Sequence, residues 1–264
     1  MLTALVGIPI VALIVWWRDG ALVFPVALAL AMISLHELAT ATRNTETPII
    51  ETIAYPALLA LMLAPKIAYW YNRDTVIIFV RWIPWLLTVA ALIWAVLHYP
   101  LRRRISLLSV ALTVLATLYV SLFLALVFVR SHPAGHALMW LTLLGVWAGD
   151  IAAYYTGRAV GRQKLTPLSP GKTREGVQAS IVATIITCTI VAVVGNLGWT
   201  HGILLGIIIG ILAPLGDLAE SFWKRELGVK DLGRLLPGHG GVLDRCDSLL
   251  FAAFATYVYT LWRL

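Results

Sequence analysis

Long apolar stretches alternate with short polar segments along the whole 264-residue chain. An α-helix needs about 20 mostly apolar residues to cross the hydrocarbon core of a bilayer. Stretches of roughly this length lie near residues 2–17, 21–42, 50–70, 76–98, 106–130, 136–158, 176–196, 200–222 and 246–263. The pattern predicts an all-α, polytopic integral membrane protein with about nine transmembrane helices. The third stretch contains Pro56 and Pro65, so a short re-entrant or tilted segment is an alternative there.

Composition supports the membrane assignment and narrows the partners. The chain is 60% hydrophobic and 12% charged, whereas soluble domains are about a quarter charged. A net charge of +7 could indicate nucleic-acid binding. The basic residues instead cluster at the ends of apolar stretches, which favours a role in topology and contact with anionic lipid or nucleotide, and no nucleic-acid partner is expected.

Loop charge predicts the orientation. Most lysines and arginines follow the second, fourth, sixth and eighth stretches, so these loops are expected in the cytoplasm. The two most polar loops, residues 159–175 and 223–245, then share the cytoplasmic face of the cytoplasmic (inner) membrane. We expect one multi-pass membrane domain over residues 1–264, with less constrained spans in 1–130 and the catalytic spans in 136–264.

Acidic residues cluster in the stretch from Asp217 to Ser248. Asp217, Ser221 and Lys224 fall at helical spacing on one face of a predicted helix, together with Glu220. On the next predicted helix Asp244 and Asp247 are three residues apart and also share a face. Carboxylates from two facing helices suit Mg²⁺, so we expect the metal ligands to be Asp217, Ser221, Asp244 and Asp247. A structural ion pair between Asp217 and a cation from a neighbouring helix is the alternative, because Lys224 lies two turns away on the same helix as Asp217.

The loop between these two helices has the composition of an anion-binding site. Gly240 and Gly241 allow backbone N–H groups to approach an anion closely. Phosphate-binding cations are available at Lys224, Arg225, Lys230 and Arg245. His239 is either a general acid or a turn residue, and no strong base is required because a phosphomonoester has a second pKa of about 6.

A second polar loop, SPGKTREG, covers residues 169–176. It lacks the GxxxxGK[ST] spacing of a P-loop. Thr173 as a helix N-cap has a glycine three residues on, which fits a capping box poorly. We therefore expect nucleotide contact, and the candidate residues are Ser169, Lys172, Thr173 and Glu175.

Other ionisable residues lie within apolar stretches. His36 and Glu37 are interpreted as helix–helix hydrogen-bonding residues. Asp150 is interpreted either as a member of a polar network that supports the site or as a direct ligand.

Three segments together resemble the CDP-diacylglycerol synthases, or phosphatidate cytidylyltransferases. The main signature is the run from Ser221 to Asp247, which includes KDLGRLLPGHGGVLDRCD. SPGKTREG resembles the SPKKTxEG element of that family, and DIAAYYTG, at residues 150–157, resembles its DxxAYxxG element. The chain departs from the family pattern at Gly171, where the family has a lysine, and at Arg174, Trp223 and Cys246.

The resemblance implies a nucleotidyltransferase of phospholipid biosynthesis. Its reaction converts CTP and phosphatidate to CDP-diacylglycerol and diphosphate, with Mg²⁺, a second cation such as K⁺, and a homodimer in the membrane lipid. The residues that would carry catalysis are Asp217, Lys224, Asp244 and Asp247.

Two other classes of function remain open from sequence. Intramembrane carboxylates are also typical of transporters and channels, although the chain shows no internal repeat. The charged loop alone does not separate a phosphatidate cytidylyltransferase from a related CTP-dependent enzyme that acts on another lipid phosphate; a screen of acceptors with labelled CTP separates them.

Overall fold

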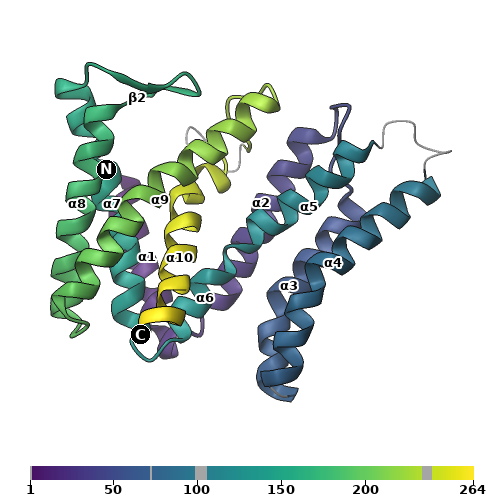
Figure 1. Cartoon of the computed structure of the whole chain (residues 1–264), viewed down its shortest axis with the longest axis horizontal. Helices are drawn as coiled ribbons and strands as arrows, with labels where there is room; N and C mark the ends of the chain where they lie inside the picture. Colours follow the sequence, from purple (N-terminus) through teal and green to yellow (C-terminus); the bar gives the residue numbers. More distant parts are fainter. Residues whose placement is uncertain (1, 72, 99–105, 234–239) are drawn as a thin grey trace. The chain divides into compact units, whose positions relative to one another are not determined.

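The apolar stretches form helices in the computed structural model, which describes residues 2–71, 73–98, 106–233 and 240–264. The fifth predicted span is divided by a break at residues 122–123. The helices, shown in Figure 1, are α1 (Leu2–Trp16), the 3₁₀ helix η1 (Trp17–Gly20), α2 (Val23–Thr42), α3 (Glu51–Tyr71), α4 (Arg73–His98), α5 (Leu107–Ser121), α6 (Leu124–Ser131), α7 (Gly135–Val160), α8 (Arg174–Val194), α9 (Trp199–Glu226) and α10 (Leu243–Arg263). The prediction of an all-α membrane protein is confirmed.

Five helical segments of the described chain are long and apolar enough to cross a membrane. They are α2, α5 with α6, α7, α8 and α9. Shorter apolar helices cover Glu51–Pro65 and Pro84–Leu97. Pro56 and Pro65 lie inside α3 without ending it. The length criterion therefore supports five of the predicted spans, and the total of nine stays a prediction.

The chain divides into two compact units, each made of segments that are distant in sequence. One unit comprises Met1–Ala27, Ala125–Glu226 and Arg245–Leu264, and the other comprises Leu28–Leu124 and Leu227–Asp244. One of these boundaries, between Leu124 and Ala125, lies before residue 130, where the expected catalytic spans were separated from the earlier spans; that functional division stays a prediction. The packing also assigns the first 27 residues to the unit that contains the second half.

Close helix packing in the first unit comes from small residues on α9. A Cβ atom on Gly202 would lie 2.6 Å from the Cα atom of Thr189, and one on Gly206 would lie 2.6 Å from the Cα atom of Ile185. Glycines four residues apart allow two helix backbones to approach closely within a membrane. The α8 and α9 helices are therefore in direct backbone contact along this stripe.

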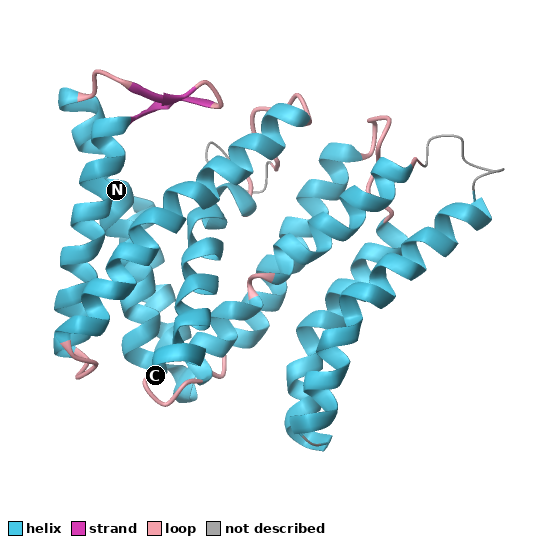
Figure 2. Ribbon diagram, in the orientation of Figure 1, coloured by secondary structure: helices cyan, strands magenta, loops and turns pink. Residues whose placement is uncertain are grey.

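The predicted polar loop before α8 is a short β-hairpin (Figure 2). Strand β1 (Lys164–Thr166) pairs antiparallel with β2 (Ser169–Thr173), and these are the strands of the described chain. Thr173 then caps α8, because its Oγ1 atom accepts a hydrogen bond of 3.1 Å from the N–H of Gly176. The hairpin therefore runs directly into the capped first turn of α8.

The second unit is a group of helices with polar links between them. The Nδ1 atom of His36 on α2 lies 3.1 Å from the hydroxyl of Tyr55 on α3, which confirms the helix–helix interpretation of His36. The N–H of Ile50 donates to the Oγ1 atom of Thr113 on α5 over 2.9 Å. These contacts join α2, α3 and α5.

Candidate active site

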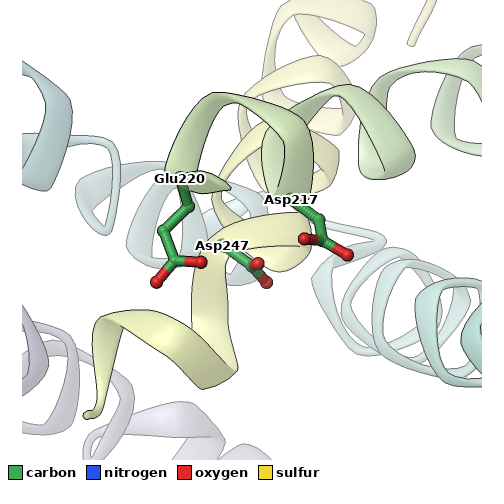
Figure 3. Close-up of side chains that lie close together, drawn as sticks. All are labelled: Asp217, Glu220 and Asp247. Atoms are coloured by element: carbon green, nitrogen blue, oxygen red, sulfur yellow. The ribbon is translucent and has the colours of Figure 1, made fainter. Parts of the chain in front are cut away.

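Three carboxylates converge where α9 meets α10. Asp217 and Glu220 project from α9 toward Asp247 on α10 (Figure 3). One oxygen from each carboxylate lies within 4.8 Å of the others. Glu220 is 1% exposed and Asp247 is 9% exposed. We call Asp217, Glu220 and Asp247 the acidic cluster.

A glycine lets the two helices approach at this point. A Cβ atom on Gly216 would lie 2.5 Å from the backbone oxygen of Asp247. Any larger residue at position 216 would force α9 away from α10. The close backbone contact therefore brings the cluster residues of the two helices together.

Two lysines neutralise part of the cluster charge. The Nζ atom of Lys172, on β2, lies 2.5 Å from Oδ2 of Asp217, and that of Lys224, on α9, lies 2.6 Å from Oε2 of Glu220. The structural alternative for Asp217 was an ion pair with a cation from a neighbouring helix. The structure pairs Asp217 with Lys172 of the hairpin, and Lys224 with Glu220. With every group ionised, the negative charges of the three carboxylates outnumber the positive charges of the two ammonium groups, so the cluster can bind a further cation.

The hairpin lies against the end of α9. Besides the ion pair of Lys172, the Nε atom of Arg225 donates to the backbone oxygen of Leu168 over 3.4 Å. These contacts bring residues of the two predicted polar loops together. Their predicted location on the cytoplasmic side of the membrane stays a prediction.

A cavity of about 450 Å³ opens beside the cluster. It lies between α7, the hairpin, α8 and α9, and its lining combines acidic, basic and small residues. The lining residues are Asp150, Ala153, Tyr154, Gly157, Arg158, Gly161, Lys164, Gly171, Lys172, Thr173, Gly176, Val177, Ser180, Pro214 and Asp217. Three cations on its wall, Arg158, Lys164 and Lys172, suit a polyanionic ligand.

The SPGKTREG residues divide between the cavity and local structure. Lys172 and Thr173 line the cavity, but the Thr173 hydroxyl oxygen is used as the α8 cap. An oxygen of Glu175 accepts from the N–H of Gln163 over 3.2 Å and ties the start of the hairpin to α8. Ser169 begins β2. The N-cap interpretation of Thr173, judged unfavourable from sequence, is therefore correct without a capping box.

Residues of the glycine-rich loop belong mostly to the second unit. Within it, Oδ2 of Asp244 accepts a 2.6 Å hydrogen bond from the N–H of Gly241. Gly240 has a φ of +81°, which favours glycine. Lys230 and Arg245 are exposed, and His239 lies outside the described residues. The substrate-binding roles of these residues stay predictions.

The acidic cluster contains two of the predicted metal ligands, Asp217 and Asp247. Ser221, the third, is buried next to Glu220 on α9. Asp244, the fourth, precedes Asp247 by one turn of α10 and accepts a hydrogen bond from the N–H of Gly241, and its role as a metal ligand stays a prediction. Glu220 was absent from the predicted ligands, although its position three residues after Asp217 on the same helical face was the available signal.

Comparison with known proteins identifies the family. A profile of the cytidylyltransferase family matches residues 1–262. The chain is 32% identical over 255 residues to a protein of Staphylococcus epidermidis named phosphatidate cytidylyltransferase, and this match covers 95% of the chain and 94% of that protein.

Shorter matches are closer in sequence. Proteins of the same name from Synechocystis and Brucella suis are 43% and 44% identical over 141 and 133 residues. These matches cover 51% and 48% of the chain, and 47% and 48% of those proteins, so the aligned part spans about half their length. Since the profile covers nearly the whole chain, the protein belongs to the cytidylyltransferase family.

Proposed function

We propose that this protein is a phosphatidate cytidylyltransferase that transfers CMP from CTP to phosphatidate and releases diphosphate. The observation that carries the proposal is the acidic cluster beside a cation-lined cavity, near the end of α9, which is apolar and long enough to cross a membrane. One substrate is a lipid anion and the other a soluble polyanion, so they can meet only at the membrane surface. The family and the names of its relatives agree with this substrate pair.

The donor set of the cluster fits Mg²⁺. Hard carboxylate oxygens are the protein ligands that Mg²⁺ prefers, and substrate phosphates complete its coordination. Asp217, Glu220 and Asp247 would hold it, and Ser221 and Asp244 are further predicted oxygen donors on the same two helices. When bound, the ion supplies positive charge that stabilises the reacting phosphate and the departing diphosphate.

The basic residues of the chain position the anions. Lys172 faces both the cavity and Asp217, so its ammonium group can contact a nucleotide phosphate next to the cluster. Arg158 and Lys164 supply further donors along the cavity wall. Such charge-assisted hydrogen bonds are stronger than neutral ones and fix the orientation of a phosphate chain. Catalysis is then chiefly positional and electrostatic.

The attacking group requires little activation by the protein. The phosphate of phosphatidate is a monoester with a second pKa of about 6, so its oxygen is largely ionised near neutral pH. It attacks the α-phosphorus of CTP, a new P–O bond forms, and the bond to the β-phosphate breaks to release diphosphate. No general base is needed, which leaves His239 without a required chemical role.

The cellular setting follows from the charge pattern and from the family resemblance. The excess of basic residues in the hairpin and in the loop after α9 supports a cytoplasmic site in the inner membrane. This is the side on which CTP is available. A homodimer and a second cation such as K⁺ are implied by the resemblance, and size measurement in detergent and a K⁺ titration test them.

The decisive experiment is an acceptor screen. Purified protein in detergent receives labelled CTP, Mg²⁺ and a panel of lipid phosphates, and CDP-lipid products are separated. Phosphatidate should be the preferred acceptor, with one diphosphate released per CDP-diacylglycerol. Preference for another lipid phosphate would establish the related CTP-dependent enzyme instead. Absence of any CDP-lipid would overturn the proposal and favour the transporter alternative.

A further inference from the structure

A buried carboxylate in the N-terminal half binds the loop that leads into α10. Glu37 lies on α2 and is 5% exposed. Its Oε1 atom accepts a 2.8 Å hydrogen bond from the N–H of Val242, and its Oε2 atom accepts a 3.0 Å hydrogen bond from the N–H of Leu243. More than 200 residues separate the partners, and both belong to the second compact unit. Glu37 on α2 therefore contacts the first residue of α10, in agreement with its interpretation as a helix–helix hydrogen-bonding residue, and also contacts the loop residue before that helix.

These hydrogen bonds act as a helix cap supplied from elsewhere in the chain. The first N–H groups of a helix have no partner within the helix, and α10 begins at Leu243. Glu37 satisfies two backbone N–H groups at this point, while Asp244 accepts from the N–H of Gly241. A negative charge at a helix N-terminus is also stabilised by the helix dipole. The start of α10 is therefore held by carboxylates.

The loop is shaped to fit the Glu37 carboxylate. A Cβ atom on Gly241 would lie 2.5 Å from Oε2 of Glu37, and a Cβ atom on Gly233 would also collide with the carboxyl group. Both glycines flank the same side chain although eight positions separate them in the sequence. The backbone at Gly233 and the backbone at Gly241 therefore both lie against the carboxyl group of Glu37.

We propose that Glu37 is a positioning residue that fixes the first turn of α10, and through it Asp247. Asp247 lies four residues after Leu243, so its backbone N–H forms a helical hydrogen bond with the carbonyl of the residue that Glu37 holds. Loss of the Glu37 bonds unwinds this first turn and weakens the hold on the Asp247 side chain. The inference deepens the proposed function and rests on it for its catalytic consequence. Removal of a residue that orients a metal ligand without touching the metal typically lowers metal affinity by about 10–100-fold.

The test compares Glu37→Gln with Glu51→Gln. Glu51 also lies in the second unit, but its carboxylate is 35% exposed and pairs with Arg43 at the surface. Mn²⁺ binding is measured by electron paramagnetic resonance, and hydrogen exchange is measured for the peptide that spans residues 241–250. Glu37→Gln should weaken Mn²⁺ binding about tenfold or more and speed exchange at this peptide, whereas Glu51→Gln should change neither.

A third variant separates positioning from general stability. Leu58 is fully buried in the same unit, so Leu58→Ala should lower the melting temperature without changing the Mn²⁺ affinity of the folded protein. If Glu37→Gln lowers only the melting temperature, as Leu58→Ala does, the inference is wrong. If Glu37→Gln does not fold, Glu37→Asp, which keeps the charge on a shorter side chain, is measured in the same two ways. Mn²⁺ binding and hydrogen exchange like those of the wild type in the folded Glu37 variant would overturn the proposal. Wild-type protein that binds Mn²⁺ but makes no CDP-lipid would overturn the proposed function and leave the inference about Glu37 intact.

Discussion

Replacement of Asp217 by asparagine removes one charge from the acidic cluster and keeps the shape of the side chain. At an effective dielectric constant of about 20, two unit charges about 4 Å apart interact by about 4 kcal/mol. The Asp217 side chain is 35% exposed, so solvent screens part of this interaction. We expect a loss of about 2.7 kcal/mol, which is roughly 100-fold in the affinity for Mg²⁺.

The same change releases Lys172 from its ion pair. In the wild type the ammonium group of Lys172 lies 2.5 Å from Asp217, so it competes with a metal for this carboxylate. Lys172→Met should therefore strengthen metal binding and at the same time raise the KM for CTP, because a cation on the cavity wall is lost. Stronger metal binding together with weaker CTP binding distinguishes a competing cation from a side chain that only supports the fold.

The assay is diphosphate release in detergent as a function of Mg²⁺ concentration, combined with direct Mn²⁺ binding. Asp217→Asn should need about 100-fold more Mg²⁺ for half-maximal rate, while its expression and particle size stay those of the wild type. Turnover within threefold of the wild type at every Mg²⁺ concentration would refute a metal-binding role for Asp217.

Three further changes test neighbouring parts of the site. Lys224→Met removes the ammonium group that lies 2.6 Å from the buried Glu220 carboxylate. Breaking a buried ion pair costs about 3–5 kcal/mol, so thermal unfolding should show a large drop in melting temperature. An unchanged melting temperature would contradict burial of the pair. Gly216→Ala should separate α9 from α10, because the added Cβ atom would lie 2.5 Å from the backbone oxygen of Asp247. Its Mn²⁺ affinity should fall at least tenfold. The control Gly171→Ala adds a Cβ atom that meets no atom within 4 Å and should bind Mn²⁺ as the wild type does. Gly171→Lys adds a cation at an open position on the cavity wall and should lower the KM for CTP several-fold, and a KM no lower than that of Gly171→Ala would show that residue 171 does not face the nucleotide.

The sequence predicted the helices well because their signal is local. Each apolar stretch contains its own evidence, and the observed helices begin and end within a few residues of the expected ranges in most cases. Membrane helices satisfy their backbone hydrogen bonds internally, so composition alone determines most of the secondary structure. The β-hairpin was missed because a five-residue strand rich in glycine and proline has no strand pattern.

Contacts between distant residues were harder to predict. Helical spacing placed Asp217 and Glu220 on one face, yet only the packing of α10 shows that Asp247 completes the cluster. The structural alternative placed the partner of Asp217 on a neighbouring helix, whereas it comes from the hairpin. Glu37 carried no signal of its role, because its partners are backbone N–H groups that look alike in every sequence.

The assembly of one unit from separated segments has a consequence for biosynthesis. Asp217 and Glu220 are made well before Asp247, which lies on the helix that follows the glycine-rich loop. A ribosome adds about 5–20 residues per second, so for a second or more the nascent α9 carries its acidic residues without their third member. Chains truncated before α10 should therefore insert into the membrane yet remain unable to retain a divalent ion. The protein can bind the ion only when the last helix has left the translocation machinery.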